Sequence, residues 1–196
     1  MKVVACEILR SEVESVAPEV ASRTTWLPAG LHVNLDRLGE ALGDALTGAD
    51  RAVCLYGACH PDIDAWVAPS GGGRLPGKDC VAAFLTDDER RELEGRKAFV
   101  MTPGWLRHWR EIFCQGMGWE DIDARQSFGF YDLVILLDFG LEPIDDLAVL
   151  EFFDYTQTPV EIVPASLDRF HRILREVIGS HTQEMPKGET APACPE

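Results

Sequence analysis

Three cysteines stand at the ends or starts of predicted elements in separate parts of the chain. Cys6 ends the β-branched run KVVAC, Cys59 follows a buried strand predicted at 52–57, and Cys80 begins a short helix predicted at 80–85. The carboxyl ends of parallel strands share one edge of an α/β sheet, so cysteines that are distant in sequence can meet there. Thiolates are soft anionic ligands for zinc and for iron–sulfur clusters. The sequence therefore predicts a three-thiolate metal site made of Cys6, Cys59 and Cys80.

The chemistry of such a site depends on the metal. With three cysteine ligands, a [4Fe-4S] cluster keeps one iron free to bind a substrate sulfur or hydroxyl as a Lewis acid. A zinc ion would hold a thiolate or activate water. Three cysteines without an obvious fourth ligand favour the cluster, whereas the neighbouring His60 keeps zinc as an alternative. The competing interpretation is that these cysteines are small buried hydrophobic residues, as free cysteines most often are.

The other three cysteines are poorer candidates for ligands. Cys54 lies inside a predicted strand and Cys114 lies late in a predicted helix, so both are expected to be structural. Cys194 lies in a polar, proline-rich terminal segment. The absence of a CxxC pair excludes a zinc ribbon and a thioredoxin motif. A metal site would therefore have to be assembled from distant segments.

Two further side chains are candidates for a catalytic role. His60, in the segment CHPDID, could be a fourth ligand or a general acid that titrates near neutral pH, although the segment could equally be solvated loop. Asp138 ends the most apolar run of the chain, YDLVILLD, at the sheet edge where carboxylates in α/β folds meet ligands. The alternative for Asp138 is a structural partner of a turn or helix N-terminus. We expect both residues near the cysteines.

A nucleophilic role for Cys59 is a second enzymatic hypothesis. Its neighbour His60 is a poor base for it, because adjacent residues rarely orient toward one another for proton transfer, so His32 or His108 would be needed. Lys78 could lower the pKa of a nearby thiol, although a lone lysine is usually just solvated. Trp105, at a predicted strand-to-helix turn, would line a pocket or belong to the core.

The order of elements indicates the fold class. A strand followed by a helix repeats about five times, which predicts a three-layer, Rossmann-like α/β fold with a mostly parallel sheet of about five strands. The glycine-rich segment 60–77 is expected to be a mobile lid over the site. Residues 1–178 would form a single domain, and residues 179–196 are too polar and proline-rich to order themselves, which predicts a disordered tail. The predicted strands are 2–6, 52–57, 98–102, 131–138 and 160–163.

The charge of the chain narrows the choice of partners. Its 196 residues include 18 Lys and Arg against 33 Asp and Glu, a net charge of −15. Binding to nucleic acid or to an anionic membrane needs basic surface, so we expect neither. No apolar run approaches the roughly 20 residues that span a bilayer, and the N-terminus lacks the pattern of a signal peptide. We therefore expect a cytoplasmic protein with reduced cysteines.

Five short motifs, in this order and spacing, resemble a known family. They are ACEILR, YGACHPDID, KDC, TPGW and LLDFGL, and the similarity extends over roughly residues 2 to 178. The chain resembles the domain-of-unknown-function family 1638 (DUF1638). The resemblance implies cysteines at the positions of Cys6, Cys59 and Cys80. The chain departs from the family pattern at two places. It has Lys78 where many members have a histidine, which argues against a histidine role at position 78. It has CHPDID where others have C-G-N-G, which makes His60 specific to a subgroup.

The resemblance also implies a metabolic context. Members of the family occur beside components of corrinoid-dependent methyltransferases, which implies one-carbon metabolism without assigning a reaction. One expectation is a metalloenzyme, of a lyase or desulfurase type or linked to one-carbon chemistry, with an unknown small-molecule substrate. The alternative from another class is a non-enzymatic accessory protein that docks on a corrinoid protein or a methyltransferase.

Overall fold

A computed structural model describes residues 1–179. Residues 180–196, which include Cys194 and nearly all of the predicted tail, lie outside the described part of the chain, as does the side chain of His32.

The described chain forms two parallel sheets. The first has four strands in the order β2-β1-β3-β4, and the second has three in the order β5-β6-β7. Every neighbouring pair is parallel, which confirms the Rossmann-like α/β class. The predicted single sheet of about five strands is wrong in number, because residues 1–179 hold seven strands in two sheets. The strands are β1 Lys2–Cys6, β2 Thr24–Leu27, β3 Ala52–Leu55, β4 Gly73–Arg74, β5 Ala98–Met101, β6 Leu133–Asp138 and β7 Val160–Pro164.

The two strands that the sequence did not predict have weak local signals. β2 has four residues, of which only Leu27 is buried, and β4 is a glycine and an arginine that pair with β3 through the backbone. A Cβ at Gly72 would lie 1.8 Å from the Ala52 carbonyl oxygen, so this stretch lies tightly against β3. Arg74 also binds Asp64 at 2.7 Å. Segment 60–77, predicted as an irregular loop, instead contains α4 Ile63–Val67, the turn η3 Ala68–Ser70 and β4, which pairs with the sheet edge.

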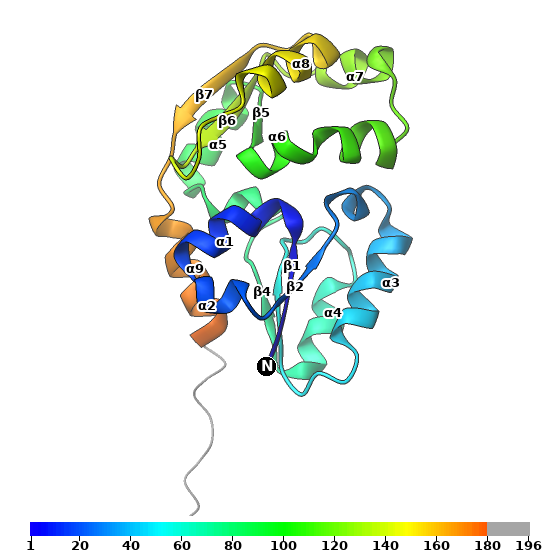
Figure 1. Cartoon of the computed structure of the whole chain (residues 1–196), viewed down its shortest axis with the longest axis vertical. Coiled ribbons are helices and arrows are strands. Elements are labelled where there is room, and N and C mark those ends of the chain that lie inside the picture. Colours follow the sequence, from blue (N-terminus) through cyan, green and yellow to red (C-terminus); the bar gives the residue numbers. More distant parts are fainter. Residues whose placement is uncertain (180–196) are drawn as a thin grey trace, which may run out of the picture.

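Helices cover both faces of the first sheet (Figure 1). Side chains alternate along β1, so Val3 and Ala5 pack in the cluster of α1, α2 and α9, whereas Val4 and Cys6 pack in the cluster of α3 and α4. This arrangement gives the expected three layers. The helices are α1 Arg10–Val16, α2 Pro18–Ala21, α3 Leu35–Leu46, α4 Ile63–Val67 and α9 Asp168–Gly179, with 3₁₀ turns η1 Glu7–Leu9, η2 Ala29–Val33 and η3 Ala68–Ser70.

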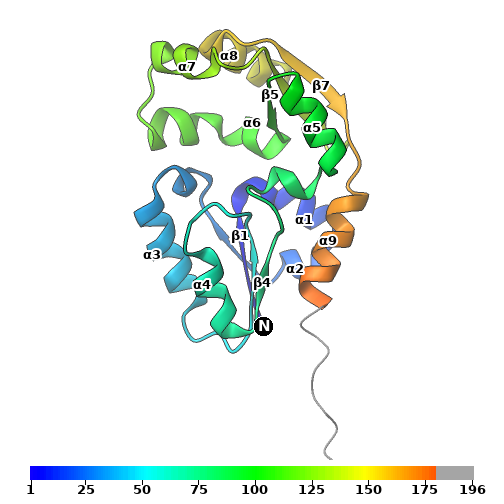
Figure 2. The ribbon, with the colours of Figure 1, turned by 180° about the vertical axis from the view of Figure 1, so that it is seen from behind.

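The second sheet carries its own helices. Figure 2 shows α5 on one side of it and α6, α7 and α8 on the other, and β7 leading into α9, which returns to the first sheet. The helices are α5 Asp87–Gly95, α6 Pro103–Trp109, α7 Asp121–Phe128 and α8 Asp146–Thr156, with the 3₁₀ turn η4 Val81–Ala83 and the π-helix η5 Arg110–Gly116, which continues α6.

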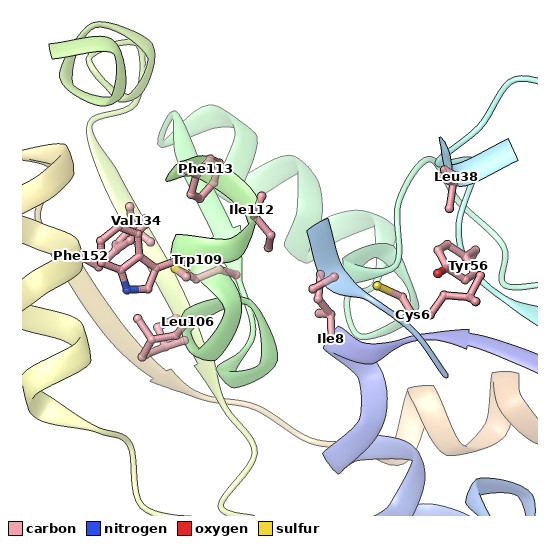
Figure 3. Packing of buried hydrophobic residues seen from close by; sticks show 14 of the residues in the cluster. Cys6, Ile8, Leu38, Tyr56, Leu106, Trp109, Ile112, Phe113, Val134 and Phe152 are labelled. Carbon is pink, nitrogen blue, oxygen red and sulfur yellow. The ribbon is translucent and has the colours of Figure 1, made fainter. Parts of the chain in front are cut away.

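Side chains from both sheets share one buried cluster. Figure 3 shows Cys6 and Ile8 in the same cluster as Trp109 and Phe152, which pack at 5.7 Å between ring centroids. The contact between the halves depends on Gly104, at the start of α6, because a Cβ there would lie 1.9 Å from the Ile8 carbonyl oxygen. Only glycine permits this approach, which brings the start of α6 against the end of β1.

Local capping signals were readable from the sequence. The Asn34 side chain accepts a hydrogen bond from the Arg37 amide at 3.1 Å and starts α3, as predicted. Thr86 and Glu89 form the predicted reciprocal capping box at the start of α5.

Candidate functional site

A cavity of about 550 Å³ lies where the two halves meet. Its lining comes from the ends of β1 and β3, from segment 78–82, from α5 and β5, and from the start of α6. The three predicted cysteines, Cys6, Cys59 and Cys80, all line it. Its volume falls in the range of roughly 300–1,000 Å³ that is usual for sites of small molecules and cofactors.

Gly57 brings two of the cysteines together. A Cβ at Gly57 would lie 2.3 Å from the Asp79 carbonyl carbon, so the turn after β3 packs backbone to backbone against segment 77–80. The Ala58 amide donates to the Gly77 carbonyl at 3.1 Å in the same contact. The Asp79 side chain then accepts from the Ala82 amide at 2.9 Å and starts the turn η4. This packing places Cys59 and Cys80 in one wall of the cavity.

Cys6 completes the set from the end of β1. The residue is buried beside Tyr56, which also lines the cavity (Figure 3). The close approach of Gly104 to η1 brings Trp105 to the same place, where its side chain lies beside Cys80 and lowers the pKa of that thiol against the effect of burial. Trp105 thus lines the pocket, which was one of its two predicted roles.

The thiols are held in the neutral form. The pKa of Cys6 is raised to about 12, mainly by burial and also by the negative charge that Cys59 would carry. Burial, followed by the neighbouring Cys6 and Cys59, raises the pKa of Cys80. Burial likewise raises the pKa of Cys59, against hydrogen bonds from the Gly57 and Cys80 backbones. The three sulfurs lie close enough that each thiolate would destabilise the others.

These pKa directions do not favour a free nucleophilic thiolate. A reactive cysteine normally has a lowered pKa, whereas that of Cys59 is raised. The ammonium of Lys78 pairs with Glu94 at 3.2 Å, so it is already engaged in an ion pair. The proposed base His108 binds Glu111 at 2.9 Å and does not line the cavity.

A soft metal fits the donor chemistry of this wall. Three neighbouring thiols that repel one another when ionised become a favourable set when a cation replaces their protons. Cys6, Cys59 and Cys80 are the residues that would hold such a centre. The side chains of residues 1–179 do not form a ready-made group of three or more His, Cys, Asp or Glu with metal-binding geometry. The thiols would therefore have to reorient on loading.

His60 lies outside the cavity, although it follows Cys59 directly. Its Nδ1 accepts a hydrogen bond from the Asp62 amide at 3.0 Å, and its ring packs on Trp66 at 4.4 Å between centroids. The Nε2 atom faces Gly39 of α3. His60 is therefore a packed histidine between α3 and α4 in this structure, and the geometry does not assemble it with the cysteines as a ligand or acid.

Asp138 also lies apart from the cysteines. Its side chain accepts from the Gly140 amide at 2.8 Å, which is the turn role that was the alternative for this residue. It borders a cavity of about 10 Å³ together with Glu12, whose carboxyl group is fully buried and has no hydrogen-bond partner among the described residues. Burial raises the pKa of Glu12 to about 7. The sequence analysis missed Glu12, although its spacing of three from Leu9 places it on the buried face of the helix.

Comparison with known proteins identifies the family of this chain. A model of a family described as proteins of unknown function (DUF1638) matches residues 26–174. The chain belongs to the DUF1638 family. The match includes Cys59 and Cys80, whereas Cys6 precedes it. Neither a curated protein nor a solved structure matches the chain.

Among residues 1–179, every helix is too short or too polar to cross a bilayer.

Proposed function

We propose that this DUF1638 protein binds a thiophilic metal centre, an iron–sulfur cluster or a zinc ion, through Cys6, Cys59 and Cys80. The observation that carries the proposal is the convergence on one cavity of about 550 Å³ of three buried thiols, which would repel one another if they were ionised. A buried thiol cluster without a cation gains nothing from its proximity, whereas a metal converts that proximity into binding energy.

The residues around the thiols have defined tasks in this proposal. When bound, the centre supplies a Lewis-acidic position that faces the cavity. Trp105 packs beside the Cys80 sulfur, and Tyr56 lies beside Cys6 on the other side of the wall. The apolar lining excludes water around a small-molecule substrate, which strengthens electrostatic interactions inside. A lyase or desulfurase type of reaction, or one linked to one-carbon chemistry, in the cytoplasm would suit such a site.

A second candidate is a non-enzymatic accessory role on a corrinoid protein or methyltransferase. The observation in its favour is the apolar exposure of α8, where Leu147 and Leu150 are 63% and 60% exposed. Large apolar side chains grouped on one helix are typical of protein contacts. The cavity and its thiols have no task in this role, so we rank it second.

Metal analysis of matched variants tests the proposal. Protein is purified without oxygen, and iron, acid-labile sulfide and zinc are measured per chain for wild type, Cys59→Ser and Cys114→Ser. Cys114 lies in the π-helix η5 and does not line the cavity, so it is the matched control. We expect Cys59→Ser to lose metal while it keeps its circular dichroism spectrum, and Cys114→Ser to keep both. A metal-free wild type, or unchanged metal in Cys59→Ser, would refute the proposal.

A further inference from the structure

The mouth of the cavity carries positive charge in an acidic protein. Lys78, Arg90 and Lys97 all line the cavity, against two lining carboxylates, Asp79 and Glu94. The whole chain has a net charge of −15, so a net positive charge at the cavity is the opposite of what its composition predicts on average. A cavity opening with a net positive charge attracts anionic ligands.

Lys97 is the cation that is free to meet a ligand. Lys78 pairs with Glu94 at 3.2 Å and Arg90 with Asp87 at 3.5 Å. Within residues 1–179, the Lys97 side chain has neither an ion-pair nor a hydrogen-bond partner. An exposed lysine without a partner is common, so this observation needs the support of its backbone.

The backbone of Lys97 is strained in a way that favours glycine. It has φ +49° directly after the end of α5, in the left-handed region where helices usually place glycine. The chain has a glycine two positions earlier, at Gly95, whose φ is not positive. Non-glycine residues in strained backbone conformations are often found at functional sites, where the side chain has a role that offsets the cost of the strain.

The walls below this mouth are apolar and aromatic. Phe99 and Trp105 pack edge to face at 6.0 Å between centroids, and Tyr131 packs on Phe99 at 5.3 Å. All three line the cavity, and Phe130 at its border is 81% exposed. A flat apolar body can pack against this aromatic wall, while an anionic group at its other end lies at the mouth.

We infer that the cavity takes a small organic acid, with its carboxylate at Lys97 and its flat apolar body against the wall formed by Phe99 and Trp105, pointing toward the three thiols. This inference rests on the proposed function in one respect, that the cavity is the functional site. It adds the class of the ligand and the residue that selects it.

A matched pair of probes tests the inference. Binding of 1-naphthylacetate and of its neutral amide, 1-naphthylacetamide, is measured by calorimetry on wild type, Lys97→Gln, Lys97→Arg and Arg96→Gln. Arg96 is the adjacent cation; it pairs with Glu161 at 2.6 Å and does not line the cavity, so Arg96→Gln removes the same charge from the protein. We expect wild type to prefer the acid by about fivefold, the effect of one exposed ion pair. Lys97→Gln should lose this preference, whereas Lys97→Arg and Arg96→Gln should keep it.

Three results would overturn the inference: equal affinity for acid and amide in wild type, an acid preference that survives Lys97→Gln, or no binding of either probe. Metal content measured on the same preparations keeps this test separate from the metal proposal. Metal-free protein that still prefers the acid through Lys97 refutes the metal centre alone. Metal-loaded protein that binds the acid and the amide equally well refutes only the inference that the ligand is an organic acid.

Discussion

Glu12 gives a prediction whose size follows from its surroundings. The carboxyl group is fully buried in α1 and both oxygens are without hydrogen-bond partners in the described chain. Burial is the main cause that raises its pKa from 4.5 to about 7; Glu142 raises it further, while Arg107 of α6 and the backbone of Glu12 lower it. Arg107 and Glu142 pair with each other above this carboxyl group.

The direction of the effect on stability follows from the higher pKa in the folded state. Folding keeps its full stability below about pH 4.5, where Glu12 is protonated in both states, and loses it as the pH rises toward 7. Each pH unit between the two values costs about 1.4 kcal/mol, so the loss reaches about 3 kcal/mol at pH 8 and is about 1 kcal/mol at pH 5. Glu12→Gln removes the titration and keeps the shape.

Urea unfolding at pH 5 and pH 8 measures this difference. We expect Glu12→Gln to be more stable than wild type by about 3 kcal/mol at pH 8 and by about 1 kcal/mol or less at pH 5. The control is Glu14→Gln on the same helix, where the side chain is 53% exposed and only 3.8 Å from Arg10; it should change stability little at either pH. Equal effects of Glu12→Gln at both pH values, or a loss of stability at pH 8, would refute the reasoning.

Four further predictions concern the backbone. Gly104→Ala should destabilise the fold by about 2 kcal/mol or more in urea unfolding, because its Cβ would lie 1.9 Å from the Ile8 carbonyl oxygen; Gly43→Ala, in α3 with nothing within 4 Å, should instead stabilise by up to about 1 kcal/mol. Lys97→Gly should increase the free energy of unfolding by about 1 kcal/mol, and so raise the midpoint of thermal unfolding, because glycine relieves the strain of the positive φ. The same variant should lose the preference for the acid over the amide. Gly57→Ala should lower metal content without unfolding the second sheet, measured by metal analysis with circular dichroism, because it displaces the backbone between Cys59 and Cys80.

Local signals predicted most of the fold. The apolar run of β6, the cap at Asn34 and the capping box at Thr86 are decided by neighbouring residues, and the structure has all three. The pairing of strands is a property of distant segments, so the sequence pattern did not reveal that the strands divide between two sheets. β4 was missed because Gly73 and Arg74 join the sheet by backbone hydrogen bonds that carry no apolar pattern.

The candidate site was predictable in part: the three cysteines were, whereas the orientations of His60 and Asp138 were not. The position of Cys6, Cys59 and Cys80 at breaks in their elements placed them on one cavity, as the strand-edge argument requires. The sequence did not predict how the side chains of His60 and Asp138 are oriented, because each accepts a local hydrogen bond, from the Asp62 amide and the Gly140 amide respectively. Adjacency in sequence or along a sheet edge does not decide which way a side chain points.

Proton release on metal binding tests the central claim most directly. Metal-free protein is titrated anaerobically with zinc at pH 7 by calorimetry in buffers of different ionisation enthalpy, which counts the protons released. Because Cys6, Cys59 and Cys80 all have raised pKa values, we expect one zinc per chain and about three protons released in wild type and in Cys114→Ser. Cys59→Ser should bind zinc more weakly and release about two. Absence of zinc binding by wild type, or the same binding and proton count in Cys59→Ser, would contradict the claim.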